Sequence, residues 1–487
     1  MKENNLKGKT LSGLFWSFLD IFFTYFLTFI IGIILARLLS PREFGLIGMV
    51  TIFITISQSF IDSGFTLALI GKQKCTQTDF STVFYFNLIV GVLLYILLFF
   101  SATAISRFFS EPQLKLLIQV LGLSLIFTAF TVVQRAKLTK DINFKLQTKI
   151  SIISSIVSGC IGIAMAYNGF GVWSLVGKSI SSIALSSLFL WYWNKWKPSL
   201  VFSLTSFVEM FNIGSKILAI GLIDTAYNNV YLLVIGKFFS STELGYYTRA
   251  EQFSNLPSSN ITTIIQRVSY PVLATIQEDK IKMKAAYQRL IKSTMLITFV
   301  TMFGMIAVAK PMILTLVGEK WLPSAIYLQL ICLAGMLYPL QAINLNMLLV
   351  HGRTDLSLKL EIFKKILAIP LIIIGVFYGV KTLIICMILL SYISFYLNSF
   401  YSGRLLNYST IQQVKDIVPS FLLAIVIGLS VFLIGFFLPF SVPINFLLQI
   451  IVGIILAIVL AEILKLENYI YLKEIVKDKL KTFKTTK

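Results

Sequence analysis

Long apolar runs alternate with short polar segments along the whole chain. Each run has about 20 residues or more, the length that an α-helix needs to cross the hydrocarbon core of a bilayer. Polar residues, prolines and glycines separate the runs, and the break before residue 382 rests on Gly379 and Lys381. The pattern predicts fourteen membrane-spanning helices, near residues 14–38, 45–70, 80–104, 114–134, 148–167, 172–193, 209–236, 245–273, 287–310, 324–349, 361–380, 382–402, 418–438 and 444–464.

The composition excludes a soluble protein. Of the 487 residues 57% are hydrophobic and 13% are charged, and the mean hydropathy is +0.86. Soluble domains carry about 25% charged residues. The first apolar run extends to about Leu39, much longer than the apolar core of a signal peptide, so we expect a retained first helix. The predicted fold class is an all-α integral membrane protein.

The 42 Lys and Arg residues predict the orientation of the helices. The net charge of +21 does not indicate nucleic-acid binding, because the cations lie mostly in short loops between apolar runs. Fourteen spans place both termini on one side, which carries 30 of these cations, whereas the opposite side carries 8 and the spans carry 4. Cytoplasmic loops are enriched in Lys and Arg. We therefore expect both termini in the cytoplasm.

Motifs for enzymatic or metal chemistry are missing from the sequence. The four cysteines form no CxxC pair, and His351 is the single histidine, so we expect no disulfide framework and no metal site. The segment 171–179 differs from a Walker A motif by one residue of spacing and lies at the start of a predicted span. We expect no cofactor and no catalytic residue. Transport would then be driven by an ion gradient or by the gradient of the substrate.

An internal repeat divides the predicted helices. ARLLSPREFGL (36–46) aligns with GKFFSSTELGY (236–246) at an offset of 200 residues, and two shorter matches follow in the same order. The repeat predicts an N-terminal six-helix lobe (1–198), a C-terminal six-helix lobe (199–403), two additional helices (404–464) and a basic cytoplasmic tail (465–487). The tail is either an amphipathic helix on the anionic inner leaflet or a solvated segment that sets topology.

Charged side chains within the predicted spans are candidates for the functional site. An ionised group at mid-bilayer costs about 2.5–3.5 kcal/mol, so such groups usually face a cavity or a partner. Shallow Lys and Arg side chains can instead extend to the headgroups. The polar residues Gln58, Ser59, Asn228 and Asn229 indicate either a wet cavity between the lobes or hydrogen bonds between helices. The charged candidates are Asp20, Asp62, Lys178, Lys216, Asp224, Arg249, Glu251 and Arg267.

Four segments resemble bacterial polysaccharide exporters. These are ARLLSPREFGLIGMV (36–50), FIDSGFTLALIGKQK (60–74), ELGYYTRAEQFSNLP (243–257) and RVSYPVLATIQED (267–279). They are similar to Wzx-type O-antigen and capsule flippases of the multidrug/oligosaccharidyl-lipid/polysaccharide (MOP) superfamily. The resemblance implies two six-helix lobes, alternating access and a central cavity lined largely by spans 1, 2, 7 and 8. It also implies a bacterial cytoplasmic membrane and a substrate oligosaccharide on undecaprenyl pyrophosphate, moved to the outer leaflet for surface polysaccharide biosynthesis.

Such a substrate is anionic, so its cavity should carry cations. We expect Arg267, Lys216, Lys178 and Arg249 to bind it, because Arg makes paired contacts with phosphate and Lys acts as a point charge. Arg267 and Lys216 are expected at matching depth near the cytoplasmic face. Asp224, Asp62 and Asp20 are expected to pair with these cations or to bind a coupling H⁺ or Na⁺. The other expected partners are membrane lipids and polysaccharide assembly proteins.

Three rival functions remain from the sequence. A cation-coupled multidrug exporter of the same superfamily would use Asp20, Asp62 and Asp224 for the ion or for a cationic drug. A membrane-embedded glycan polymerase or ligase would need a long extracytoplasmic loop, and the longest one expected, about 311–323, is short. A structural scaffold would leave the charges within the spans unexplained.

Overall fold

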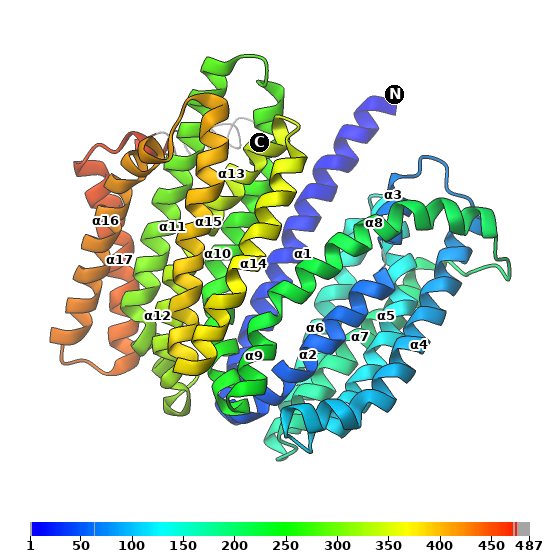
Figure 1. Ribbon diagram of the computed structural model, residues 1–487. Helices are drawn as coiled ribbons and strands as arrows, with labels where there is room; N and C mark the ends of the chain where they lie inside the picture. The colour runs from blue at the N-terminus through cyan, green and yellow to red at the C-terminus, as the bar shows by residue number, and fades with distance from the viewer. Residues whose placement is uncertain (1, 63, 471–472, 475–487) are drawn as a thin grey trace. The chain divides into compact units, whose positions relative to one another are not determined.

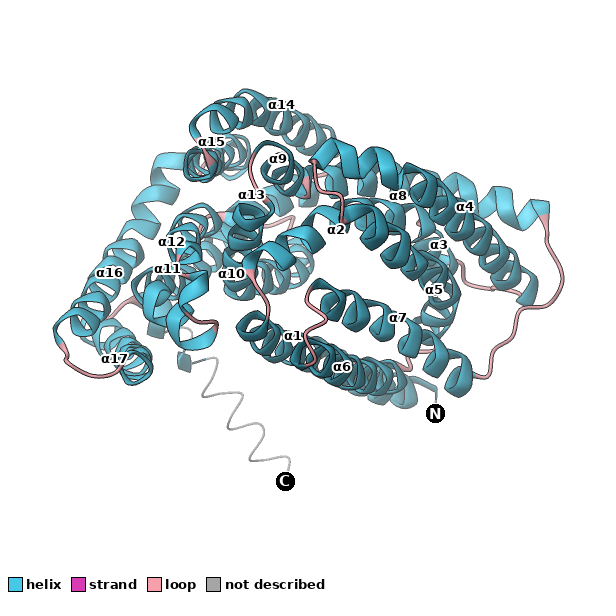
Figure 2. Ribbon diagram, turned by 90° about the horizontal axis from the view of Figure 1, so that it is seen from below, coloured by secondary structure: helices cyan, strands magenta, loops and turns pink. Residues whose placement is uncertain are grey.

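A computed structural model describes residues 2–62, 64–470 and 473–474, with backbone alone for residues 2–11, 14, 213, 264, 267 and 268. Every regular element in these residues is helical (Figures 1 and 2), as the apolar pattern predicts. Contacts divide the chain into two compact units, Met1–Gly245 (unit 1) and Tyr246–Lys487 (unit 2). This division reflects packing and does not test the repeat, so the lobe boundaries at 198 and 403 stay a prediction.

Unit 1 is a bundle in which α5 packs on α4, α7 and α2, and α6 packs on α1 and α7. Aromatic side chains from α3, α4, α7 and the segment after α7 form one of its core clusters, in which the Phe84 ring lies 5.6 Å from Trp191 and 6.0 Å from Trp196. The helices are α1 (Lys2–Leu38), α2 (Pro41–Asp62), α3 (Phe65–Gly71), α4 (Gln77–Phe109), α5 (Leu114–Lys140), α6 (Phe144–Tyr167), α7 (Val172–Asn194), α8 (Leu204–Asn228), α9 (Val230–Phe238) and the start of α10 (Ser241–Thr275).

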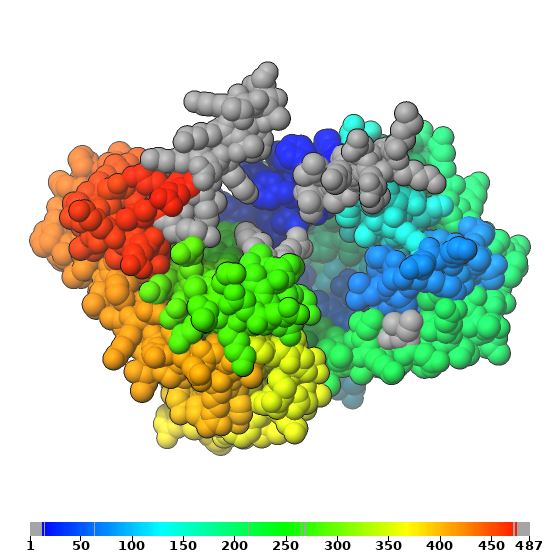
Figure 3. Space-filling view, turned by 90° about the horizontal axis from the view of Figure 1, so that it is seen from above, coloured from blue at the N-terminus to red at the C-terminus, as the bar shows by residue number. Residues whose placement is uncertain are grey.

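Unit 2 contains the rest of α10 and the helices that follow it. Here α16 and α17, orange to red in Figure 3, pack on α11 and form one edge of the unit. The helices are α11 (Lys280–Leu316), the short η1 (Glu319–Trp321), α12 (Pro323–Gly335), α13 (Tyr338–Val350), α14 (Thr354–Tyr378), α15 (Val380–Leu406), α16 (Thr410–Phe437) and α17 (Val442–Ile463). The basic tail 465–487 lies mostly outside the described residues.

Twelve helical segments of the described chain are long and apolar enough to cross a membrane. Their large apolar side chains point outward, as in Phe100 of α4 (77% exposed) and Phe436 of α16 (74%), which suits a lipid environment. The predicted spans 245–273 and 361–380 correspond to α10 and α14, which are long helices but are not among these twelve. The all-α membrane fold is confirmed, whereas the count of fourteen spans stays a prediction.

Glycines fix two close approaches in unit 1. Gly64 has φ of +67° between α2 and α3, and a Cβ there would lie 2.7 Å from the carbonyl oxygen of Gly214 on α8. At the starts of α2 and α10, a Cβ on Gly45 would lie 1.6 Å from the Ser241 carbonyl oxygen, and a Cβ on Gly245 would lie 1.9 Å from that of Pro41. Only glycine fits at such distances. Gly45 and Gly245 are 200 residues apart, the offset of the repeat, and so are Pro41 and Ser241. Each glycine therefore packs on the first residue of the other helix, and the two helix starts contact each other reciprocally.

Candidate substrate cavity in unit 1

A polar cavity of about 970 Å³ lies inside unit 1. Of the twenty-two lining residues that the structure describes, twelve are Ser or Thr and only Tyr25 is aromatic, so the wall is unusually hydrophilic for helices of this apolarity. The lining residues are Asp20, Ile21, Thr24 and Tyr25 of α1, Thr55, Gln58, Ser59 and Asp62 of α2, Thr66 of α3, Thr128, Thr131, Val132 and Arg135 of α5, Ser151, Ser154 and Ser155 of α6, Ser182, Ile183 and Ser186 of α7, Thr225 and Asn228 of α8, and Asn229.

Helical spacing brings the hydroxyl groups to this wall. Residues three, four or seven apart share one face of an α-helix, and the polar residues of α5, α6 and α7 follow this spacing. On α5 the stripe runs through Thr128, Thr131 and Arg135. Its hydroxyls also donate to the preceding turn, Thr128 Oγ1 to the Ser124 carbonyl at 2.8 Å and Thr131 Oγ1 to the Thr128 carbonyl at 2.8 Å. Such bonds let hydroxyl groups lie within an apolar helix without a separate partner.

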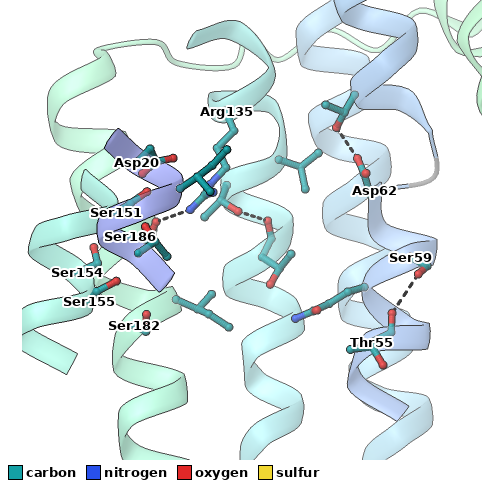
Figure 4. Close-up of a pocket in the computed structure, with 18 of the residues that line it drawn as sticks. Asp20, Thr55, Ser59, Asp62, Arg135, Ser151, Ser154, Ser155, Ser182 and Ser186 are labelled. Carbon is teal, nitrogen blue, oxygen red and sulfur yellow. Dashed lines mark hydrogen bonds between the residues drawn. The ribbon is translucent and has the colours of Figure 1, made fainter. Parts of the chain in front are cut away.

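Arg135 and Asp20 form the charged part of one wall (Figure 4). Arg135 Nη2 donates to Ser186 Oγ at 3.0 Å, and its positive charge acts on the Asp20 carboxylate from the neighbouring helix α1. The hydroxyls of Ser151 and Thr24 are the other polar neighbours of Asp20. Protein atoms surround Arg135 on most sides, but its side chain remains accessible to solvent through the cavity. A cation in this position can bind an anionic group that enters.

The α2 wall carries the second acid. Asp62 is exposed to the cavity, and its Oδ1 accepts a hydrogen bond from Thr66 Oγ1 at the start of α3. One turn earlier, the hydroxyls of Ser59 and Thr225 lie 3.1 Å apart and join α2 to α8. The Gly64 turn allows this arrangement, because it interrupts the helix directly after Asp62 and directs Thr66 back toward the carboxylate.

Three buried polar atoms of the lining have no hydrogen-bond partner among the described residues. They are Asp20 Oδ1, Thr24 Oγ1 and Ser154 Oγ. Buried polar groups are nearly always satisfied by protein or by ordered water, and leaving one unpaired costs about 1–3 kcal/mol. These atoms therefore favour a polar occupant of the cavity, either water or a ligand that carries donors and acceptors.

The charged candidates predicted from the sequence lie in different places. Asp20 and Asp62 line the cavity, together with all four uncharged candidates, Gln58, Ser59, Asn228 and Asn229.

The remaining charged candidates of unit 1 are Lys178, Lys216 and Asp224, which are not among the described lining residues. Lys216 and Asp224 are exposed on α8, and Lys178 is half-buried, with its Cβ directly opposite Gly162 of α6.

Three further candidates belong to unit 2. Glu251 is half-buried, and its Oε1 accepts a hydrogen bond from Tyr247 Oη at 3.4 Å. Arg249 is 3% exposed, donates from Nη1 to Gln252 Oε1 at 2.7 Å and lies 5.1 Å from the centre of the Trp321 ring. Arg267 is part of α10, but its side chain lies outside the described residues. The substrate-binding roles expected for Arg267, Lys216, Lys178 and Arg249, and the coupling roles of the acids, stay predictions.

Arg135 was not a candidate from the sequence. The predicted span 114–134 ends just before Arg135, because Arg135 is the first of several cations. The helix continues to Lys140, so Arg135 lies inside the bundle. The signal that indicates its place in the cavity wall is the Thr128–Thr131–Arg135 stripe, which hydropathy alone does not detect.

The described residues contain no group of three or more His, Cys, Asp or Glu side chains able to hold a metal ion. The acids of the cavity lie on separate walls, Asp20 on α1 and Asp62 on α2, beside hydroxyl groups. The arrangement suits hydrogen bonding and single ion contacts.

Residues 34–326 match the model of a family described as "Polysaccharide biosynthesis protein". This match covers more than half of the chain. The chain belongs to this family. The resemblance to bacterial polysaccharide exporters, drawn from the segments around Gly45 and Gly245, is thereby confirmed.

Relatives of this polysaccharide biosynthesis family protein include two curated bacterial proteins. The chain is 29% identical to the teichuronic acid biosynthesis protein TuaB of Bacillus subtilis over 307 residues, 62% of this chain and 63% of TuaB. The match thus spans less than two thirds of TuaB. The chain is 26% identical to the lipopolysaccharide biosynthesis protein WzxC of Escherichia coli over 376 residues, 76% of each chain.

The fold of the family member is similar to that of a solved flippase structure. The structure of the lipid II flippase MurJ in its inward closed conformation aligns with a TM-score of 0.75 and 17% sequence identity, over 93% of this chain and 98% of MurJ. At this identity the likeness shows the fold. Together with the twelve apolar segments, it establishes a multi-pass membrane protein.

Proposed function

We propose that the protein is a flippase that moves an oligosaccharide linked to undecaprenyl pyrophosphate from the cytoplasmic to the outer leaflet, by alternating access. The product would serve surface polysaccharide biosynthesis. Family membership, the name of WzxC and the fold of the lipid II flippase MurJ support this proposal. We further propose that the protein lies in the bacterial cytoplasmic membrane with both termini inside, on the basis of the 30-to-8 distribution of cations.

The hydroxyl-rich wall of the unit 1 cavity is the observation that carries the proposal. Sugars present many hydroxyl groups that both donate and accept hydrogen bonds, and Ser, Thr, Asn and Gln side chains match them. Pockets for drug-like molecules are lined predominantly by apolar and aromatic side chains, whereas this cavity has one aromatic residue among twenty-two. The lining therefore favours a glycan over the hydrophobic cations expected for a multidrug exporter.

The extracytoplasmic loop predicted at 311–323 gives no support to a glycan polymerase or ligase. Its residues form the end of α11, the single turn η1 and the start of α12. Little chain is left there to hold a glycan acceptor, so we propose transport without covalent chemistry on the sugar.

Arg135 is the residue that we propose to contact an acidic sugar or a phosphate of the substrate. Asp20 would pair with Arg135 when the cavity is empty and would be displaced from it, or protonated, when an anion binds. This step would link substrate binding to H⁺ or Na⁺ at Asp20, with Asp62 and Asp224 as further acids. Arg267, Lys216, Lys178 and Arg249 remain proposed contacts for the pyrophosphate along the rest of the pathway.

Substitution of Arg135 tests the proposal in cells that lack their own flippase for the same glycan. Arg135→Gln should lower surface polysaccharide at least tenfold, because a charge-assisted hydrogen bond worth about 1.5–3 kcal/mol is lost. Arg135→Lys should retain part of the activity. The matched control is Arg107→Gln, which removes the same charge from the exposed end of α4, away from the cavity.

The amount of each variant in the membrane is measured in parallel, so that poor expression is not mistaken for lost transport. Wild-type surface polysaccharide in Arg135→Gln, at normal protein levels, would show that the unit 1 cavity does not hold an anionic part of the substrate. A loss of drug resistance without any loss of polysaccharide would support the multidrug exporter instead.

A further inference from the structure

A second polar feature of unit 1 lies on an exposed surface of α6, close to the end at which α1 begins. Lys145 and Lys149 are exposed and one helical turn apart, so they share a face of this helix. The Lys145 ammonium lies 5.6 Å from the centre of the Trp16 ring of α1, and the Lys149 ammonium lies 4.4 Å from that of Trp193 of α7. Two lysines of one helix are thus each placed over a tryptophan from a different flanking helix.

The packing of α6 against α1 and α7 holds this arrangement (Figure 2). Thr148, between the two lysines, donates from Oγ1 to the Trp16 carbonyl at 2.9 Å and fixes α1 beside α6. The Phe189 ring stacks on Trp193 at 5.0 Å and orients that indole. An aromatic ring contacts only one side of an ammonium group. The N–H groups on the other side remain able to donate to an anion.

The indole N–H groups of Trp16 and Trp193 differ from those of Trp191 and Trp196 in their hydrogen bonding. Trp191 Nε1 donates to the Phe130 carbonyl at 3.1 Å, and Trp196 Nε1 donates to Gln77 Oε1 at 2.8 Å. Within the part of the chain that the structure describes, Trp16 Nε1 and Trp193 Nε1 have no acceptor. Tryptophans with one apolar side and one free donor are typical of the boundary between lipid and water.

The same stripe of α6 becomes apolar toward the middle of the helix. Ile156 lies seven residues beyond Lys149, about 10 Å along the helix axis, and its side chain is 45% exposed. Cys160, four residues further on the same stripe, is exposed as well. The surface therefore offers cations and indole donors at one level and an apolar strip at the next, which matches the headgroup and the acyl chains of a phospholipid.

The charge near this surface favours an anionic lipid. Residues 137–149 carry four lysines and one acid, Asp141. From these contacts we propose that Lys145, Lys149, Trp16 and Trp193 form a binding site for the phosphate of an anionic phospholipid, whose acyl chains lie along α6. The site is separate from the cavity that contains Arg135 and does not depend on the proposed transport function.

Binding of phosphatidylglycerol and phosphatidylcholine to the purified full-length protein tests the site, by native mass spectrometry with both lipids present. The Lys145→Gln/Lys149→Gln variant should lose about 25-fold in affinity for phosphatidylglycerol, since each basic residue near an anionic headgroup contributes about fivefold. Its affinity for phosphatidylcholine should not change. Lys145→Arg/Lys149→Arg should bind phosphatidylglycerol as the wild type does, which separates loss of the site from loss of the fold.

The matched control is Lys195→Gln/Lys197→Gln, which removes two exposed cations from the loop after α7. It should change the affinity for phosphatidylglycerol less than about twofold, because neither lysine lies over a tryptophan. Trp16→Leu/Trp193→Leu, which keeps every charge, should weaken binding severalfold. The proposal is overturned if the wild type binds both lipids equally, if the α6 variant binds like the wild type, or if the control loses as much as the α6 variant.

Discussion

Replacement of Gly45 by alanine should destabilise unit 1, although alanine normally stabilises a helix. The added Cβ would lie 1.6 Å from the Ser241 carbonyl oxygen, whereas ordinary contact begins at 3.4 Å, so the starts of α2 and α10 must separate by about 1.8 Å (3.4 − 1.6). The separation would also strain the 2.8 Å hydrogen bond from Ser241 Oγ to Glu111 Oε1.

The magnitude follows from these two effects. Overpacking costs about 1–3 kcal/mol, and a weakened hydrogen bond costs about 1 kcal/mol. The better helix propensity of alanine offsets up to about 1 kcal/mol of this. A net loss of about 1–3 kcal/mol should lower the melting temperature of the purified protein by roughly 2–12 °C, on the scale of a domain of about this size. Thermal unfolding in detergent, followed by tryptophan fluorescence, measures it.

Gly221→Ala is the matched control, because Gly221 lies within α8 and an added Cβ there meets nothing within 4 Å. It should leave the melting temperature unchanged or raise it slightly. Gly245→Ala should resemble Gly45→Ala, and the double variant should cost little more than either single one, because one separation of the helices relieves both clashes. Equal shifts for Gly45→Ala and Gly221→Ala would refute the close reciprocal packing.

Two further predictions concern topology and helix capping. Reporter fusions at Gly8 and Lys484 should both report a cytoplasmic location, as the distribution of cations requires, and a fusion on each side would rule out an even number of spans. Ser409→Ala should destabilise the start of α16 by about 1 kcal/mol, because Ser409 and Gln412 form a reciprocal capping box; an unchanged melting temperature would show that the cap contributes nothing.

Hydropathy was sufficient to place the helices but not their interruptions. Among the described residues, each predicted apolar run is helical over most of its length, and the break assigned to Gly379 is confirmed, since α14 ends at Tyr378 and α15 begins at Val380. The breaks between α2 and α3, α8 and α9, and α12 and α13 were not predicted. They lie inside apolar runs and depend on local backbone geometry, such as the positive φ of Gly64, to which a hydropathy window is insensitive.

The sequence predicted the carboxylates of the candidate site but not its hydroxyl residues or Arg135. Asp20 and Asp62 stand out in the sequence because a carboxylate in an apolar run is rare. The hydroxyl residues that form most of the wall do not stand out, because Ser and Thr occur throughout membrane helices. The prediction does not include Arg135, because the predicted span stops before the first cation although α5 continues to Lys140.

The extent of unit 1 has a consequence for its biosynthesis. The predicted lobe ends at residue 198, but α8 and α9 pack on α2, α3 and α4, and the unit extends to Gly245. While the ribosome is still translating the segment before Leu204, the hydroxyl faces of α5, α6 and α7 lack the wall that Thr225 and Asn228 later supply. The cavity is therefore among the last parts of unit 1 to be completed during membrane insertion, and a fragment that ends at residue 198 would leave those polar faces without the α8 wall.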